Sequence, residues 1–257
     1  MTTPEQIQKE YYTRTAVKYD EMHLQHEDQQ HYTALKHISL LLGPLGIENI
    51  LDVGAGTGRA IRYFMDNHPA LKVKGIEPVE ALVEQAQRGG IARETIEVGR
   101  GEALPYPDGS FDGVCAFGVM HHVKRPSIVV GEMMRVARKA VFISDSNRFG
   151  QGSMPARRVK LLLWRLGLWG AFNFAKTRGR GYMMSESDGL AYSYSVYDSF
   201  DQLAQWAEQV LAVPTVKVKA TSWSHPLLTA SHVLLCAIKD ESAQTRSASP
   251  RPVTVAP

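Results

Sequence analysis

The chain has 257 residues, of which 44% are hydrophobic and 21% are charged, and its net charge at pH 7 is +3. This length suits one sizeable α/β domain with an insertion, and the composition is ordinary for a soluble globular protein. No apolar run approaches the ~20 residues that span a bilayer, and the N-terminus lacks the cationic start and apolar core of a signal peptide. No cysteine–histidine cluster has zinc-ligand spacing, so no metal is expected. Cys115 and Cys236 lie in apolar runs and are expected to be buried free thiols in a reducing cytoplasm.

Residues 1–45 are predicted to form an N-terminal helical cap. Residues 8–22 carry a run of tyrosines that includes Tyr19, and they are interpreted as an amphipathic helix that packs on the domain. A second helix is predicted over 31–42, where Gly43-Pro44 stops it.

A glycine-rich turn at 54–58 is the feature around which the next segment is organised. An apolar run at 50–53 precedes it and an amphipathic segment follows it, so the order is strand, tight turn and helix. Glycines suit such a turn because it needs unusual backbone angles and lets a ligand approach bare backbone. The helix N-terminus then supplies free N–H groups and a positive dipole end. The glycines fall as G-x-G-x-G directly after Asp52, and Arg59 stands where a dinucleotide-binding fingerprint requires glycine.

The next strand, 71–77, ends in an acidic residue, Glu77, about 20 residues beyond the glycine turn. In a doubly wound sheet the second strand ends beside the first, so this carboxylate can accept hydrogen bonds from both hydroxyls of a ribose. A helix with apolar positions from Val79 to Ala86 follows and ends at Gly89-Gly90.

The remaining elements complete a doubly wound pattern. Strands are predicted over 95–98, 111–117, 140–144, 215–220 and 232–238, with helices over 129–137 and 198–210. Seven strands with helices between most of them predict a three-layer α/β sandwich around a mostly parallel, Rossmann-like sheet. Residues 46–146 and 193–240 would form this domain, 147–192 an insertion after the fifth strand, and 241–257 a disordered tail.

Three segments together resemble the class I S-adenosylmethionine-dependent methyltransferases of the small-molecule type, with a methyltransferase-11-like domain. They are the glycine turn after Asp52, the segment Gly99 to Tyr106, and Phe111-Asp112-Gly113-Val114 followed by His121-His122-Val123. The resemblance covers roughly residues 8–146 and implies S-adenosylmethionine as the cofactor. In the second segment, Arg100 and Gly101 depart from the family's Asp-Ala.

The resemblance implies a set of cofactor-binding residues. These are Tyr19, Asp52, Gly54, Ala55, Gly56, Glu77, Pro78, Gly101, Glu102, Ala103 and Phe117. Carbonyls near Gly54, supported by Asp52, would hold the methionine ammonium group, and Glu77 would hold the ribose. Pro78 and Ala103 would flank the adenine, while Phe117 lies near the methionyl end. Glu102 or backbone groups would contact the adenine amino group, and Tyr19 either belongs to a flap over the cofactor or simply packs.

His121 and His122 follow a central strand, at the sheet edge where open α/β sheets bind their ligands. A histidine there can accept a proton from a hydroxyl or amine acceptor as a general base. The alternative is that one histidine caps a turn and the other faces solvent. A carboxylate acceptor would need no base.

The insertion has an unusual composition, because residues 147–182 contain eight basic residues, no acidic one and six aromatic ones. A helix is predicted over Arg157–Trp169 and, in the boldest interpretation, lies over the substrate mouth as a lid that selects an acidic acceptor. It could equally rest on an anionic membrane surface, form a homodimer contact, or pack as a structural helix.

The leading hypothesis is an enzyme that methylates oxygen, nitrogen or carbon of a small-molecule metabolite in a biosynthetic pathway. The second hypothesis is a nucleic-acid (RNA) methyltransferase, drawing on the basic insertion. It is weakened because no Asn/Asp-Pro-Pro-Tyr/Phe segment follows the fourth strand, so no nucleic-acid partner is expected. The third is a non-catalytic scaffold that keeps the cofactor-binding fold.

Overall fold

The computed structural model describes residues 3–19, 29–186, 188–218 and 225–239. Its centre is a seven-stranded sheet with the order β3-β2-β1-β4-β5-β9-β8. The strands are β1 (Asn49–Val53), β2 (Lys72–Glu77), β3 (Ile96–Val98), β4 (Phe111–Phe117), β5 (Ala137–Ser146), β8 (Gln209–Pro214) and β9 (His232–Ile238). The five strands from β3 to β5 are parallel, whereas β9 runs antiparallel to both of its neighbours. The predicted mostly parallel, doubly wound sheet is therefore confirmed.

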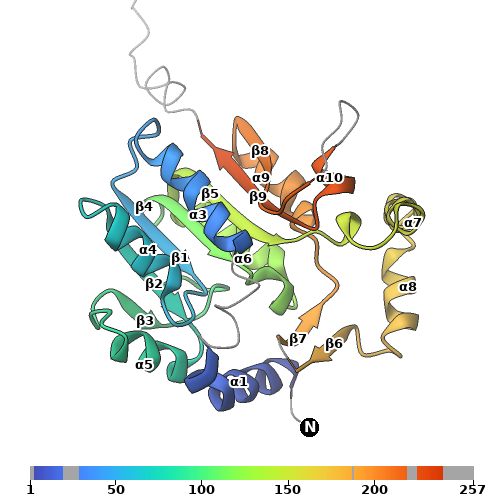
Figure 1. Cartoon of the computed structure of the whole chain (residues 1–257), viewed down its shortest axis with the longest axis horizontal. Helices are drawn as coiled ribbons and strands as arrows, with labels where there is room; N and C mark the ends of the chain where they lie inside the picture. The colour runs from blue at the N-terminus through green and yellow to red at the C-terminus, as the bar shows by residue number, and fades with distance from the viewer. Residues whose placement is uncertain (1–2, 20–28, 187, 219–224, 240–257) are drawn as a thin grey trace, which may run out of the picture.

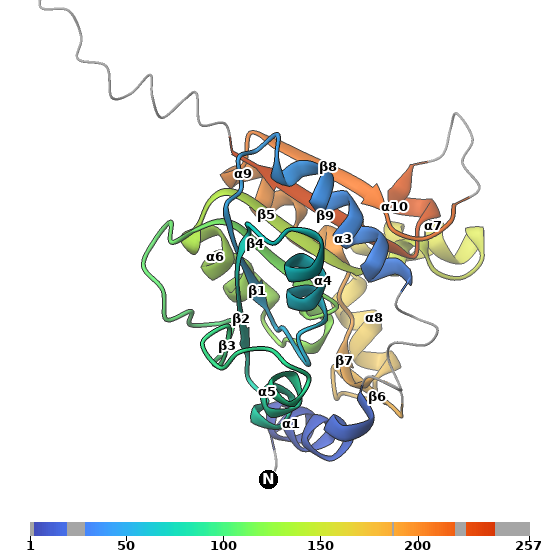
Figure 2. The same cartoon turned by 60° about the vertical axis from the view of Figure 1, so that its left-hand side comes forward.

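Helices cover both faces of the sheet and make it the middle of three layers (Figures 1 and 2). On one face pack α3 (Gln29–Leu42), α4 (Arg59–Asn67) and α5 (Glu80–Arg88), and on the other pack α6 (Pro126–Val136) and α9 (Phe200–Trp206). The fully buried Phe64 of α4 and Phe142 of β5 belong to the first of these interfaces. Burying one such side chain contributes about 1.5–3 kcal/mol.

The central strand β4 shows why this sequence forms a covered parallel sheet. All seven of its residues are buried, as expected for a strand with helices on both faces. Cys115 of β4 and Cys236 of β9 are both buried free thiols, as predicted. No helix within the described residues is long and apolar enough to cross a bilayer.

The insertion after β5 contains two helices and a small hairpin. In order it contains η3 (Arg148–Gly150), α7 (Met154–Arg165), α8 (Trp169–Lys176), β6 (Tyr182–Ser185) and β7 (Gly189–Tyr192), and η4 (Val196–Ser199) then leads into α9. The helices α7 and α8 lie at one edge of the molecule, whereas the β6–β7 hairpin lies beside the N-terminal helix α1 (Pro4–Thr15) in both views (Figures 1 and 2).

Some predicted boundaries are wrong at the two ends of the chain. The sixth strand of the sheet is Gln209–Pro214, whereas a strand was expected over 215–220, and the helix expected over 198–210 is confined to η4 and α9. The residues from Val210 to Val213 continue the apolar pattern of the helix, but they pair with β9 instead. The N-terminal helix ends at Thr15 and is followed by η1 (Ala16–Lys18). Residues 20–22 and the expected disordered tail, 241–257, lie outside the described residues.

Candidate functional site

The principal cavity, about 720 Å³ in volume, lies at the carboxyl ends of the parallel strands. Its lining combines the glycine turn, the end of β2, the loop after β3, the turn η2 (Met120–His122), α1 and β7. This is the edge where open α/β sheets bind ligands, and the volume falls within the about 300–1,000 Å³ of small-molecule sites.

The glycine turn is shaped by positions that exclude a side chain. Gly54, Gly56 and Gly58 have φ values of +76°, +56° and +83°, in the left-handed region that favours glycine. A Cβ at Gly54 would lie 2.5 Å from a methyl carbon of Val119. The helix α4 begins immediately after Gly58, so its free N–H groups point toward the turn.

Glu77 closes the turn from the end of β2. Its carboxylate accepts hydrogen bonds from the backbone N–H groups of Gly56 and Val79, both at 3.0 Å. Burial raises the pKa of Glu77 to about 7, although these two hydrogen bonds favour the ionised form. The side chain is only 5% exposed yet lines the cavity. A buried carboxylate with two fixed donors and remaining lone pairs is suited to accept hydroxyl protons of a bound ligand.

Asp52 lies beneath the glycine turn, outside the described lining of the cavity. Burial raises its pKa to about 7, Arg59 opposes that rise, and the Cys115 thiol lies 3.8 Å from its Oδ1. Asp52 is therefore placed to support the glycine turn from below and does not reach the cavity wall.

Most of the predicted cofactor residues come together around the cavity. Those that line it are Tyr19, Gly54, Gly56, Glu77, Pro78, Gly101, Glu102 and Phe117. Ala55 and Ala103, like Asp52, fall outside the described lining; Ala55 packs in the apolar cluster beneath the turn. Glu102 is paired with Arg100 at 3.2 Å, so the arginine that departs from the family pattern holds the acid expected near adenine.

His121 lies between two carboxylates. Its Nδ1 is 2.7 Å from Oδ1 of the fully buried Asp145, and its Nε2 is 3.1 Å from Oδ2 of Asp188. Burial lowers the pKa of His121, but the charges and hydrogen bonds of both carboxylates outweigh burial and raise it to about 10. An imidazolium at neutral pH cannot accept a proton, so this environment is unfavourable for a general base.

His122 is held differently, between the backbone and three side chains, one of which is Gln8, whose Nε2 lies 3.0 Å from the His122 Nδ1. Its Nδ1 lies 2.7 Å from the carbonyl oxygen of Leu190 and therefore carries the proton in that contact. Its Nε2 lies 3.0 Å from the Tyr12 hydroxyl and 3.3 Å from Oδ1 of Asp188. Both histidines thus direct Nε2 toward the same carboxylate, with all three side chains lining the cavity.

Two further histidines lie in this cavity, His31 of α3 and His232 of β9. Their rings meet edge to face at 4.9 Å, and burial lowers the pKa of both, that of His232 to about 4. His232 Nδ1 is 2.7 Å from the Thr215 hydroxyl, whereas His31 Nδ1 is buried without a hydrogen-bond partner among the described residues. These two imidazoles are neutral near pH 7, in contrast to His121.

Sequence reasoning missed Asp145, Asp188, Tyr12 and the second histidine pair. Asp145 near the end of β5 could have been found by the rule that led to Glu77, because it too lies near the carboxyl end of a parallel strand. Asp188 has no such signal, since it lies in the insertion, 67 positions from His121.

The expectation that Arg157–Trp169 lies over the mouth of this cavity is not supported. The helix α7 begins three residues before the predicted range and ends at Arg165, and Trp169 begins α8 instead. The described lining takes Gln151, Asp188, Ala191 and Tyr192 from the insertion and nothing from α7. Arg157 instead donates a hydrogen bond to the Leu228 carbonyl, which ties α7 to α10 (Pro226–Thr229) at the edge of the fold. The β6–β7 hairpin occupies the place expected for the helix.

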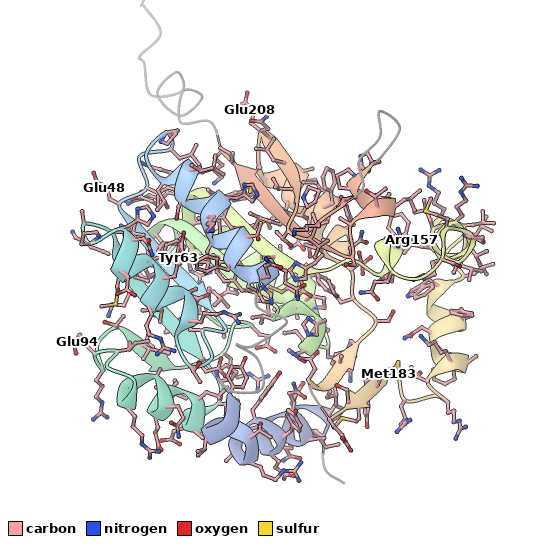
Figure 3. All side chains as sticks on the ribbon, in the orientation of Figure 1. Glu48, Tyr63, Glu94, Arg157, Met183 and Glu208 are labelled. Atoms are coloured by element: carbon pink, nitrogen blue, oxygen red, sulfur yellow. The ribbon has the colours of Figure 1, made fainter. Side chains whose placement is uncertain are left out.

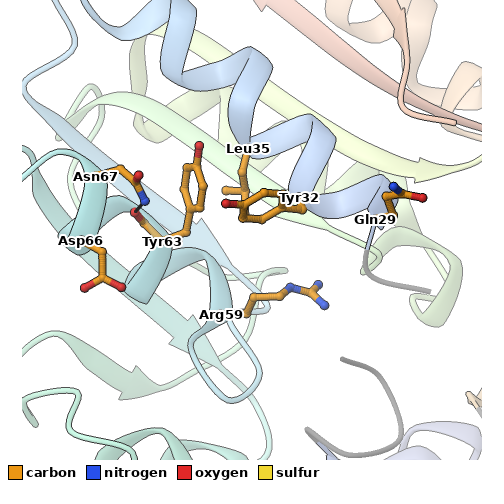
Figure 4. Close-up of a pocket in the computed structure, with 7 residues that line it drawn as sticks. All are labelled: Gln29, Tyr32, Leu35, Arg59, Tyr63, Asp66 and Asn67. Carbon is orange, nitrogen blue, oxygen red and sulfur yellow. Dashed lines mark hydrogen bonds between the residues drawn. The ribbon is translucent and has the colours of Figure 1, made fainter. Parts of the chain in front are cut away.

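A second, shallower pocket of about 500 Å³ lies between α3 and α4 (Figure 4). Tyr32 and Tyr63 form its wall, with ring centroids 5.3 Å apart, and Arg59 lines both this pocket and the main cavity. It contains neither histidine pair and none of the cofactor residues predicted from the sequence.

Comparison with known proteins agrees with this geometry. A family model described as a methyltransferase domain matches residues 51–143. An uncharacterised methyltransferase of Mycolicibacterium paratuberculosis is 26% identical over 65% of this chain and 71% of its own length. Ajmaline N-methyltransferase of Rauvolfia serpentina is 31% identical over 37% of this chain and 34% of its own length. An uncharacterised methyltransferase of Schizosaccharomyces pombe is 29% identical over 37% of this chain and 38% of its own length. The chain therefore spans little more than a third of these last two relatives.

Solved structures share the fold at low sequence identity. A possible histamine N-methyltransferase from Thermotoga maritima has a TM-score of 0.57 and 19% identity, covering 91% of this chain and all of its own. Magnesium protoporphyrin IX methyltransferase from Synechocystis, with bound S-adenosylhomocysteine, also has a TM-score of 0.57, with 15% identity over 93% of this chain and all of its own.

Proposed function

Because this chain belongs to the class I S-adenosylmethionine-dependent methyltransferases, we propose that it methylates a small-molecule acceptor bound beside His121 and His122. The observation that carries the proposal is one cavity that joins the glycine turn and Glu77 to the histidine pair. The cofactor supplies an electrophilic methyl group on a sulfonium, and the protein's task is to hold an acceptor atom in line with it.

The residues at one end of the cavity fit this cofactor. The left-handed glycines bring bare backbone to the cavity wall, and Glu77 presents a buried carboxylate for two ribose hydroxyls. Charge-assisted hydrogen bonds of this kind contribute about 1.5–3 kcal/mol each. Phe117 and Tyr19 add ring surfaces to the same lining. The roles of these residues toward the cofactor are part of the proposal.

The histidine pair would serve the acceptor. His121 and His122 share Asp188, and neither takes part in the hydrogen bonds that fix Glu77 and the glycine turn. Both N–H groups of the His121 imidazolium face Asp145 and Asp188, so His121 holds the Asp188 carboxylate at the cavity wall and is not a base. The names of relatives include ajmaline N-methyltransferase and a ubiquinone/menaquinone biosynthesis C-methyltransferase, but those alignments are short, so the proposed class of acceptor rests on the cavity.

The cofactor proposal is tested by calorimetry with S-adenosylmethionine. The wild type should bind one molecule per chain, and Glu77→Ala should weaken binding at least tenfold while the circular dichroism spectrum is unchanged. Glu80→Ala is the matched control, because Glu80 is an exposed acid three residues away. If the wild type and Glu77→Ala bind S-adenosylmethionine equally well, Glu77 does not hold the ribose. If the wild type does not bind S-adenosylmethionine at all, the non-catalytic scaffold is the remaining hypothesis.

A separate surface supports contact with an anionic membrane. The helices α7 and α8 contain no buried residue, and their apolar side chains are exposed, among them Leu162 at 56% and Phe174 at 62%. Basic residues interleave with them, without an acidic residue between 147 and 182. Figure 3 labels Arg157 of α7. Two copies of so basic a surface repel each other, which disfavours a symmetric dimer, and the exposed apolar side chains disfavour nucleic acid.

Vesicle sedimentation tests this membrane proposal. The wild type should bind phosphatidylglycerol vesicles more tightly than phosphatidylcholine vesicles, and Leu162→Asp with Phe174→Asp should abolish the difference. Leu40→Asp is the control, because Leu40 is 71% exposed on α3, outside the insertion. Absence of binding, or a concentration-dependent dimer that the double variant disrupts, would overturn the membrane interpretation.

A further inference from the structure

We propose that His121, His122 and Asp188 form a binding site for one divalent transition-metal ion at the acceptor end of the cavity. The three side chains each offer one ligand atom, and these atoms lie within 4.8 Å of one another. They come from two separate parts of the chain, because the histidines belong to η2 and Asp188 to the turn before β7. Local spacing therefore gives no sign of the site.

The separations of the ligand atoms suit a metal. An ion about 2.0–2.2 Å from each ligand, with ligand–metal–ligand angles between 90° and 110°, places neighbouring ligand atoms about 3–3.5 Å apart. The two histidine–aspartate separations, 3.1 Å from His121 Nε2 and 3.3 Å from His122 Nε2, already fall in this range. The two Nε2 atoms face different oxygens of the one carboxylate, so a small rotation of Asp188 would direct one oxygen to an ion between them.

The groups around the three ligands fix the histidines as a metal site requires. A ligating histidine usually donates its other ring N–H to a carboxylate or a backbone carbonyl, which sets the tautomer and the ring orientation. The Nδ1 atom of His121 lies 2.7 Å from Oδ1 of the buried Asp145, and the Nδ1 atom of His122 lies 2.7 Å from the carbonyl oxygen of Leu190. Both rings are therefore oriented through Nδ1, and a bound ion would take the place of the proton on His121 Nε2 and of the Tyr12 hydroxyl contact at His122 Nε2. Asp145 is further held by the backbone N–H groups of Met120 and Ser146.

The ligand set indicates the kind of ion. Imidazole suits zinc, iron, cobalt, nickel and copper, and two histidines with one carboxylate on one side of an ion leave its other positions open. Those positions would face the cavity, because all three ligands line it. The acceptor class is therefore a molecule with a hydroxyl or carboxylate oxygen that can occupy an open position. This last step rests on the proposed methyl transfer; binding of the ion does not.

The experiment is a titration of the full-length protein, freed of metal with a chelator, with Co²⁺ and no S-adenosylmethionine. Calorimetry should give one ion per chain, and visible absorption should show the bands of nitrogen- and oxygen-ligated cobalt. His122→Gln and Asp188→Asn should each weaken binding at least tenfold, because loss of an outer partner alone costs 10–100-fold. Zinc should displace the cobalt and remove the bands.

Glu186→Gln is the matched control, since Glu186 is an exposed acid in the same turn. It should bind cobalt as the wild type does. The proposal is overturned if the wild type lacks a saturable one-to-one site, or if His122→Gln and Asp188→Asn bind as well as Glu186→Gln; the cluster is then an ion-pair network alone. Retained binding of S-adenosylmethionine shows that a variant is folded. Because cobalt is titrated without cofactor, a failure to bind cobalt would not contradict the methyl-transfer proposal. A failure to bind S-adenosylmethionine would likewise not contradict the metal site.

Discussion

Asp188 Oδ2 lies 3.1 Å from His121 Nε2, although the two residues are 67 positions apart. The contact joins the inserted hairpin to the turn after the central strand β4. It holds an ionised carboxylate against the face of a histidine pair that the fold already places at the sheet edge.

The first prediction concerns the pH dependence of cofactor binding. The pKa of Glu77 is about 7, so lowering the pH below 7 should protonate it and weaken S-adenosylmethionine binding. Affinity measured by calorimetry should rise through about pH 7 to a plateau, and Glu77→Gln should bind weakly without this rise. If the variant keeps the full pH profile, Asp52, whose pKa is also about 7, is responsible.

Ionisation of Glu77 should favour cofactor binding but destabilise the ligand-free fold. Burial penalises the ionised carboxylate, whose ordinary pKa is 4.5. Its contribution to the free energy of unfolding should therefore fall as pH rises from 4.5 to about 7. Urea titrations across this range should show Glu77→Gln gaining stability relative to the wild type at the higher pH.

The histidine pair should affect turnover and not cofactor affinity. His122→Gln should lower the rate of methyl transfer by roughly 10²-fold or more if its Nε2 accepts the acceptor's proton. His121→Gln should lower the rate because Asp188 and the acceptor are then less well positioned. The dissociation constant for S-adenosylmethionine should stay within threefold of the wild type. A loss of rate below threefold at both positions would remove the pair from the mechanism and favour a carboxylate acceptor.

His121 should also make stability depend on pH in the alkaline range. Its pKa is raised from 6.5 to about 10 in the folded state, so its contribution is fully present below pH 6.5 and is lost as pH rises through about 10. The melting temperature of the wild type should fall over this interval more steeply than that of His121→Gln. Parallel curves for the two proteins would contradict the paired imidazolium.

The glycine turn should tolerate no side chain at Gly54. Its φ of +76° is left-handed, and a Cβ would lie 2.5 Å from Val119. Gly54→Ala should lower the free energy of unfolding by about 1–3 kcal/mol and weaken cofactor binding. Gly170→Ala is the control: it lies in α8 with open space around it and should stabilise by about 0.5–1 kcal/mol. Equal effects at both sites would refute the steric argument.

The sequence predicted which residues gather at the proposed cofactor end better than it predicted the surroundings of the histidine pair. Gly54 and Glu77 could be found because a turn and a strand end carry local patterns, and the parallel sheet places them together. His121 and His122 were found as residues, but their environment was not, because Asp188 comes from the insertion and Tyr12 from α1. The apolar run at Val210 was assigned to a helix, since pairing with β9 is a long-range contact that periodicity does not reveal.

The inserted hairpin and the N-terminal helix are joined to each other as well as to the cavity. Gln8 accepts a hydrogen bond from the Leu190 N–H at 2.5 Å, and the Tyr11 hydroxyl donates to the Glu186 carbonyl at 2.6 Å. Both segments lie outside residues 51–143, the part of the chain that the methyltransferase model matches. The two segments that close the proposed acceptor end can therefore vary together, as a coupled pair, without any change in the glycine turn or Glu77.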